Sequence, residues 1–306
     1  MDTLYEESGI FRLSRARGIK MEYYEQLNFT GKGDVEESEE TAIKLIREFE
    51  ELALRRCPDK GYIVGYSGGK DSDCLVDLFF RAGVKFTIIH NHTTMDIPDT
   101  VYYIRKRFKE WRERGVECEI FYPEKSFWRI CEELKMLPFR KRRFCCALLK
   151  EKQPYKGAIY SFGVRKSESA SRAKYRDSIE TRNRKDFSDI QRFHFDDSDK
   201  VKELDACYTN NYFIVNPMAY WTTDVRDRYI AKHSLEVNPV YEKYGLKRCG
   251  CIMCCMTSPK ERQKEAKLFP KYAENLRLLC HRIKKAWTRK EDITTGDELY
   301  EKYLQG

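Results

Sequence analysis

The chain has 306 residues, of which 41% are hydrophobic and 13% aromatic, so it can bury a sizeable core and is not globally disordered. Lys and Arg outnumber Asp and Glu by 58 to 49, and the resulting net charge of +9 fits a phosphate-bearing ligand or nucleic acid as well as it fits a plain solvated surface. Neither an apolar signal core nor an 18-residue apolar stretch is present, so we expect a cytoplasmic protein with no membrane-spanning helix.

Strand-like and helix-like patterns alternate along the chain. Helices are predicted over 36–56, 71–81, 98–113 and 126–136, and strands over 62–66, 85–90, 117–122, 158–162 and 212–215. This alternation predicts an α/β fold with a mostly parallel sheet that helices cover on both faces.

Other segments break this rhythm. Residues 174–211 are polar and charged, which predicts an insertion or mobile loop, and residues from Ser258 onward carry helix-start signals that predict C-terminal helices. We therefore divide the chain into an N-terminal extension of unknown role (1–35), a main domain (36–257) and a C-terminal helical region (258–306).

The segment after the first predicted strand has the features of a phosphate-binding loop. Residues 62–72 read YIVGYSGGKDS, in which Gly68 and Gly69 let backbone amides turn toward a ligand and Lys70 adds a full charge. A helix that starts near Asp71 adds the positive end of its dipole, and the flanking serines can donate hydrogen bonds. The string is not a Walker A loop, and it predicts a nucleotide site; an ordinary strand–turn–helix is the alternative.

Two further segments carry candidate ligand-binding side chains. His90 and His92 follow the second strand, at the sheet edge where open α/β sheets bind ligands, although histidines there often only pack. Residues 163–172 read GVRKSESASR, whose cations would meet phosphate while Glu168 orients an arginine. A solvated charge run is the alternative for this second segment.

Taken together, six strings resemble the phosphoadenosine phosphosulfate (PAPS) reductase family within the PP-loop adenine nucleotide alpha-hydrolase-like superfamily. They are SGGKDS at 67–72, NHTTMDIPDT at 91–100, RFCCALLK at 143–150, GVRKSES at 163–169, WTTDV at 221–225 and GCIMC at 250–254. The resemblance, which covers about 60–260, implies a Rossmann-like domain that binds ATP, PAPS or adenylyl sulfate, with Mg²⁺ as a further expected cofactor.

The resemblance also implies site residues. Catalytic roles fall to Lys70, Asp71 and Arg165, and nucleotide binding to Ser67, Gly68, Gly69, Lys70, Asp71, Ser72, His90, Thr93, Gly163, Arg165, Glu168 and Arg172.

Twelve cysteines without a secretory signal predict reduced thiols, some of them metal ligands. A C-x-x-C pair and an adjacent Cys-Cys pair can hold one metal or cluster. Cluster-bearing members of the resembled family hold a 4Fe-4S cluster in this way, which here implies Cys145, Cys146, Cys251 and Cys254. Zinc and free thiols are the alternatives, and Cys249 and Cys255 are neighbouring competitors. The remaining cysteines are expected to be buried apolar residues.

One departure from the family separates three functional hypotheses. Assimilatory reductases carry a nucleophilic cysteine in a C-terminal Glu-Cys-Gly-x-His tail, whereas this chain has no cysteine after Cys280. We therefore favour an adenylating iron–sulfur sulfurtransferase, similar to enzymes of DNA phosphorothioation and tRNA thiolation, over a true PAPS or adenylyl-sulfate reductase or a non-enzymatic sensor. Basic segments at 140–143 and 165–185 suggest DNA or tRNA as the acceptor, and a cysteine desulfurase is a candidate sulfur donor.

Overall fold

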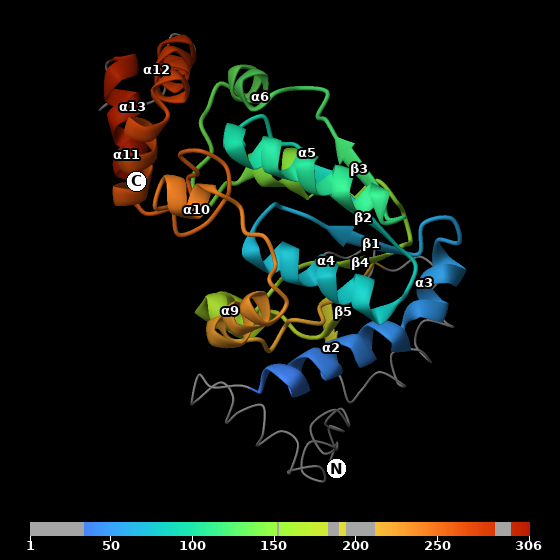
Figure 1. The fold of residues 1–306 in the computed structure, drawn as a ribbon. Helices are drawn as coiled ribbons and strands as arrows, with labels where there is room; N and C mark the ends of the chain where they lie inside the picture. The colour runs from blue at the N-terminus through green and yellow to red at the C-terminus, as the bar shows by residue number, and fades with distance from the viewer. Residues whose placement is uncertain (1–33, 152, 183–189, 194–211, 285–294) are drawn as a thin grey trace, which may run out of the picture.

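The computed structural model describes residues 34–151, 153–182, 190–193, 212–284 and 295–306 (Figure 1). The predicted extension at 1–35 therefore lies almost wholly outside the described residues, as does much of 174–211.

A seven-stranded sheet in the order β3-β2-β1-β4-β7-β5-β6 forms the centre of the fold. Its strands are β1 (Tyr62–Gly65), β2 (Phe86–Asn91), β3 (Glu117–Phe121), β4 (Ile159–Ser161), β5 (Ile179–Arg182), β6 (Ile190–Phe193) and β7 (Tyr212–Val215). The pairs β1–β2, β2–β3, β1–β4 and β4–β7 are parallel, which confirms the predicted α/β class.

The strands β5 and β6 were not predicted. β5 pairs with β7 and with the edge strand β6, both times in antiparallel register, so parts of the segment 174–211 belong to the sheet rather than to a loop. Their charged sequences hide the strand pattern, because a strand near the edge of a sheet is stabilised by its neighbours as much as by its own composition.

One face of the sheet carries the main hydrophobic core. Helices α2 (Val35–Glu48), α4 (Lys70–Ala82), α5 (Pro98–Glu113) and α9 (Thr223–Lys232) all contribute to this core, together with alternate residues of the strands. The opposite face carries a smaller cluster that includes Ile63, Ile89 and Tyr160, to which no described helix adds a buried residue. The expected helical cover is therefore one-sided within the described part of the chain.

The predicted helix over 36–56 is two helices, because the backbone leaves the helical conformation at Phe49 (φ −101°, ψ 7°) before α3 (Glu50–Arg56). Phe49 itself is fully buried, and its side chain anchors this junction in the core.

The C-terminal region is helical, as predicted. Helices α11 (Pro259–Leu268), α12 (Pro270–Lys284) and α13 (Gly296–Gln305) share a second hydrophobic core with α6 (Phe127–Leu134) and the short α10 (Val240–Lys243) (Figure 1). The Cys-rich segment 249–255 contributes to the same core, and short helical turns lie at Cys146–Lys150, Lys166–Glu168 and Ala170–Tyr175.

Asp73, in the first turn of α4, makes the stability of the main core depend on pH. It accepts a 2.5 Å hydrogen bond from the Tyr66 hydroxyl, and burial raises its pKa to about 7. Because the folded protein holds this proton more tightly than the unfolded chain, the free energy of unfolding should fall as pH rises from about 4 to about 7. In Asp73→Asn, denaturant midpoints measured across that range should fall less steeply; a slope equal to that of the wild type would contradict this role.

Candidate nucleotide and cysteine site

The loop between β1 and α4 has a rigid backbone. Gly68 adopts a left-handed conformation (φ 70°), and Gly69 and Ser72 bond to each other in both directions, amide to hydroxyl at 3.0 Å and hydroxyl to carbonyl at 2.8 Å. The Asn238 amide donates to the Gly68 carbonyl at 2.9 Å. The loop therefore lies at the amino end of α4, where backbone amides and the helix dipole favour an anion.

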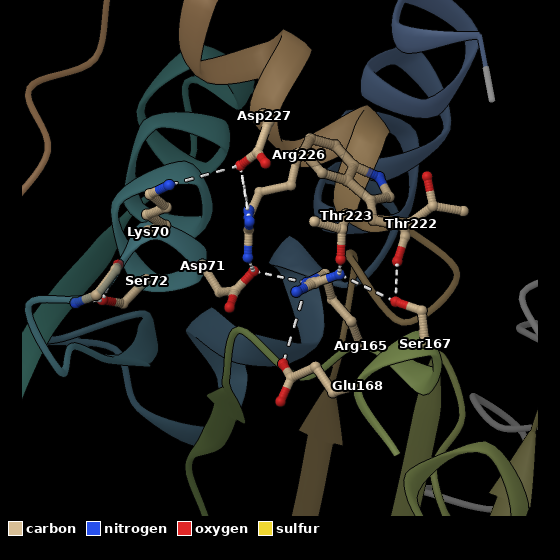
Figure 2. Close-up of polar contacts among 12 residues, drawn as sticks. Lys70, Asp71, Ser72, Arg165, Ser167, Glu168, Thr222, Thr223, Arg226 and Asp227 are labelled. Carbon is tan, nitrogen blue, oxygen red and sulfur yellow. Dashed lines mark hydrogen bonds and ion pairs between the residues drawn. The ribbon is translucent and has the colours of Figure 1, made fainter. Parts of the chain in front are cut away.

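Lys70 is the cation of this loop and is partly exposed. Its Nζ lies 4.0 Å from a carboxylate oxygen of Asp227 on α9 and 5.2 Å from the centre of the Tyr241 ring (Figure 2). These contacts are loose, because a direct ion pair is usually below 4 Å and the Asp227 side chain is half exposed. Lys70 is thus held over the loop but can still turn to a phosphate.

Asp71 and Arg165 form a buried ion pair beside the loop. Arg165 Nε lies 2.6 Å from the Asp71 carboxylate, and the Arg165 side chain is only 3% exposed (Figure 2). Arg165 also donates to Ser167 at 2.9 Å and Thr223 at 3.3 Å. The structure therefore brings together two of the predicted catalytic residues.

Gly163 allows this approach between the segment after β4 and the start of α4. A Cβ atom at Gly163 would lie 2.9 Å from the backbone carbonyl of Asp71, so only glycine permits the contact. Glu168 and Arg172 form an ion pair further out, with Glu168 4.0 Å from Arg165. The segment 163–172 thus presents one buried cation to the loop rather than a fully solvated charge run.

His90 and Thr93 lie at the end of β2, next to the loop. The His90 Nδ1 is 2.9 Å from the Tyr66 carbonyl, whereas the Thr93 amide donates to Asp96 at 2.7 Å. The Thr93 hydroxyl also lies 3.4 Å from the Cys251 sulfur. Their predicted roles in nucleotide binding stay predictions.

The predicted cysteine ligands converge from two distant segments. An isolated β-bridge joins Asp96 to Cys251, and in the chain stretches that the structure describes these cysteines are free thiols. A hydrogen bond with Cys146 lowers the pKa of Cys145. The hydrogen bond with Cys255 and burial outweigh this effect and raise the pKa to about 11. The nearby Cys251 adds to this rise, so the 145–146 pair faces the segment 251–255.

Cys254 and Cys249 lie in different environments. A hydrogen bond from Cys255 lowers the pKa of Cys254 to about 7, which favours its thiolate. Cys249 lies at the phosphate loop instead: a Cβ at Gly69 would be 2.8 Å from its sulfur, and its thiol is 3.5 Å from the Tyr241 hydroxyl. The loop and the cysteines therefore share one edge of the sheet.

Four residues near the loop were not predicted from the sequence: Arg226, Asp227, Asn238 and Tyr241. Arg226 lies 3.5 Å from Asp71 and pairs with Asp227 at 2.7 Å. The strings that hold these residues, WTTDVRDR and NPVYEKYG, look like packing and turn sequence. For Arg226 and Asp227, the sequence does offer a signal. Opposite charges alternate just after the helix-capping Thr222, which places these two residues on the first turns of α9.

A family model and several known proteins are similar to this chain. Residues 61–257 match the family model described as the phosphoadenosine phosphosulfate reductase domain. An uncharacterized protein of Methanocaldococcus jannaschii is 25% identical over 267 residues, which are 84% of this chain and 56% of that protein. The chain thus spans about half the length of this curated relative.

Two solved structures are similar to this chain at lower sequence identity. A PAPS reductase from Candida auris in a phosphate complex has a TM-score of 0.45 at 14% identity, covering 75% of this chain and 94% of that one. The U34-tRNA thiolase NcsA from Methanococcus maripaludis with its [4Fe-4S] cluster has a TM-score of 0.40 at 14% identity, covering 85% and 80%. Among the described helices, none combines the length and apolar character that crossing a membrane requires.

Two glycines with the same backbone conformation allow the effect of backbone strain to be distinguished from the loss of a ligand contact. Gly68 and Gly83 have φ of 70° and 71°, but a Cβ would lie 2.9 Å from Ile104 at Gly68 and would meet nothing within 4 Å at Gly83. Both alanine variants should lose about 1 kcal/mol or more of stability, since alanine is strained at positive φ. Calorimetry should show weaker nucleotide binding only in Gly68→Ala; an equal loss in Gly83→Ala would argue against a ligand-binding loop.

Proposed function

Because the chain belongs to the phosphoadenosine phosphosulfate reductase domain family, we propose that it is a PP-loop enzyme that adenylates an acceptor with ATP and couples this step to sulfur transfer. The observation that carries the proposal is the shared edge: the phosphate loop, the Asp71–Arg165 pair and the cysteine segment meet there. A nucleotide bound at the loop would therefore lie beside the sulfur chemistry.

The protein residues have distinct proposed roles in adenylation. An oxygen of the acceptor attacks the α-phosphorus of ATP, the bond to the bridging oxygen breaks, and pyrophosphate leaves. The loop amides of Ser67 to Ser72 and the Lys70 ammonium would hold the charge of the departing pyrophosphate, with Mg²⁺ as a counter-ion. Arg165 would stabilise the α-phosphate, while Asp71 and Glu168 fix its position. His90, Thr93, Gly163 and Arg172 complete the proposed nucleotide pocket.

The thiols fit an iron–sulfur cluster better than one zinc ion. Four thiolates about 2.3 Å from one zinc lie about 3.8 Å apart. Within the described residues, no three cysteine sulfurs lie within 4.8 Å of one another. The ligands of a 4Fe-4S cluster bind four different irons and so stand further apart. Cys145, Cys146, Cys251 and Cys254 would hold the cluster, which supplies a site for binding and delivering sulfur.

A nucleic-acid acceptor is supported by one surface feature. Residues 140–143 read RKRR, all four are exposed, and only Phe144 separates them from the Cys145–Cys146 pair. Cations beside the sulfur site would bind the phosphates of DNA or tRNA and place a base or backbone atom there. A cysteine desulfurase is the proposed source of the sulfur.

Reaction products distinguish this proposal from its alternatives. Protein purified without oxygen would be incubated with ATP, PAPS or adenylyl sulfate, with and without tRNA and DNA. Release of pyrophosphate from ATP supports the adenylating enzyme, release of sulfite supports a reductase that uses another cysteine, and binding without turnover supports a sensor. Only the first result agrees with the proposal.

Lys70→Ala should weaken ATP binding about tenfold or more, because a charge-assisted contact to phosphate contributes about 1.5–3 kcal/mol. The control is Lys109→Ala on α5, which removes the same charge from a side chain that is 80% exposed. Calorimetry with both variants tests the assignment, and unchanged affinity in Lys70→Ala would remove Lys70 from the site.

Serine variants of the cysteines test the cluster. Cys145→Ser, Cys146→Ser, Cys251→Ser and Cys254→Ser should each lose most of the iron from a wild type that holds about four per chain, and should melt at lower temperature. Cys249→Ser and Cys255→Ser should keep the brown colour. Cys118→Ser is the control for a core thiol, since burial raises its pKa to about 12. Stoichiometric zinc without visible absorbance, or loss of iron in Cys255→Ser with retention in Cys254→Ser, would contradict the assignment.

A further inference from the structure

A second group of metal-binding side chains lies at the end of β2, beside the cysteines. His90 and His92 are two residues apart in an extended segment, so their side chains point to the same side. A tight turn then brings Asp96 back to them. Thr94 has a left-handed backbone in that turn (φ 62°), which is unusual for a β-branched residue. The candidate ligand atoms of the three residues all lie within 4.8 Å of one another.

His90 presents an unprotonated nitrogen to this group. Its Nδ1 lies 2.9 Å from the Tyr66 carbonyl, which can only accept a hydrogen bond, so Nδ1 carries the proton. Its Nε2 is then a bare acceptor, and it is buried without a hydrogen-bond partner among the described residues. The side chain is only 6% exposed, and an unsatisfied polar atom at that depth is costly. A ligand at Nε2 would remove this cost.

The other two members hold complementary charge and geometry. An oxygen of Asp96 lies 3.0 Å from Nδ1 of His92 and accepts a 2.7 Å bond from the Thr93 amide. The group thus offers imidazole nitrogens and a carboxylate oxygen.

We propose that His90, His92 and Asp96 bind a divalent transition-metal ion, separate from the cysteine site. Two imidazoles and a carboxylate suit Zn²⁺, Fe²⁺ or Mn²⁺ and leave coordination positions open for water or a substrate oxygen. The bond from His90 Nδ1 to a backbone carbonyl is the outer contact that commonly orients a ligating histidine.

The site has close charged and sulfur neighbours. Thr93 separates it from Cys251, whose sulfur lies 3.4 Å from the Thr93 hydroxyl. Cys251, and after it Asp96, raises the pKa of the exposed Lys150 through opposite charge. Lys150 thus offsets part of the negative charge that would attract a cation, so the imidazoles must supply much of the affinity. The inference does not depend on the proposed function, because it concerns metal binding alone.

Cobalt(II) is a suitable probe, because its visible spectrum distinguishes nitrogen–oxygen ligands from thiolates. Protein purified without oxygen would be titrated with Co²⁺, with equilibrium dialysis to count the ions. We expect about one additional ion per chain, weak ligand-field absorption and no new thiolate charge-transfer band. His92→Gln and Asp96→Asn should weaken binding about tenfold or more, since loss of even an outer contact costs about 10–100-fold.

The control is His233→Gln, which alters a histidine paired with Glu39 at 2.9 Å, far from the group along the chain. Thermal melting with and without Co²⁺ is the second measurement, because an ion that binds the folded state raises the melting temperature of wild type and control but not of the ligand variants. Equal Co²⁺ binding in wild type, His92→Gln and Asp96→Asn would overturn the site. A thiolate charge-transfer band that disappears in Cys251→Ser would also overturn it. So would a Co²⁺ signal that excess Zn²⁺ does not displace.

Discussion

The ion pair between Asp71 and Arg165 is the interaction on which the site depends. Arg165 is almost fully buried, and a buried cation is tolerated only when it is paired and hydrogen-bonded; here Asp71 pairs with its Nε, and Ser167 and Thr223 accept from its Nη1. The pair joins the first turn of α4 to the segment after β4 and to α9, which lie far apart in the sequence. Removal of Asp71 would cost about 3–5 kcal/mol by leaving the buried Arg165 without its nearest carboxylate. The pair thus fixes the loop backbone as well as the position of a cation beside it.

Parallel pairing explains why so many chemical groups meet at this place. The strands β1, β2 and β4 are adjacent and parallel, so the loop after β1, the histidines at the end of β2 and Arg165 after β4 reach the same edge. The Cys-rich segment then crosses that edge, where Asp96 bridges to Cys251 and the Ile252 amide donates to the Met95 carbonyl at 2.7 Å. The order of the strands, rather than any single contact, therefore places the phosphate loop next to the cysteines.

The sequence predicts local features well and long-range ones poorly. The five parallel strands and the glycine loop have strong local patterns, because buried strands are apolar and a tight turn needs glycine at Gly68. By contrast, β5 forms through pairing with β7, and β6 through pairing with β5, while Asn238 reaches Gly68 from 170 residues away. Nothing in the local sequence marks Arg226 as a neighbour of Asp71 or His90 as unpartnered, since both facts arise only when distant segments pack.

We propose that the phosphate loop and the cysteine site form one functional unit. Electron paramagnetic resonance of the reduced, anaerobically purified protein, with and without saturating ATP, tests this proposal directly. We expect ATP to shift the signal of the proposed cluster, because Cys249 packs against Gly69 and Cys251 contacts Thr93 at the same edge. A cluster spectrum that stays unchanged while calorimetry shows ATP bound would contradict the proposed coupling.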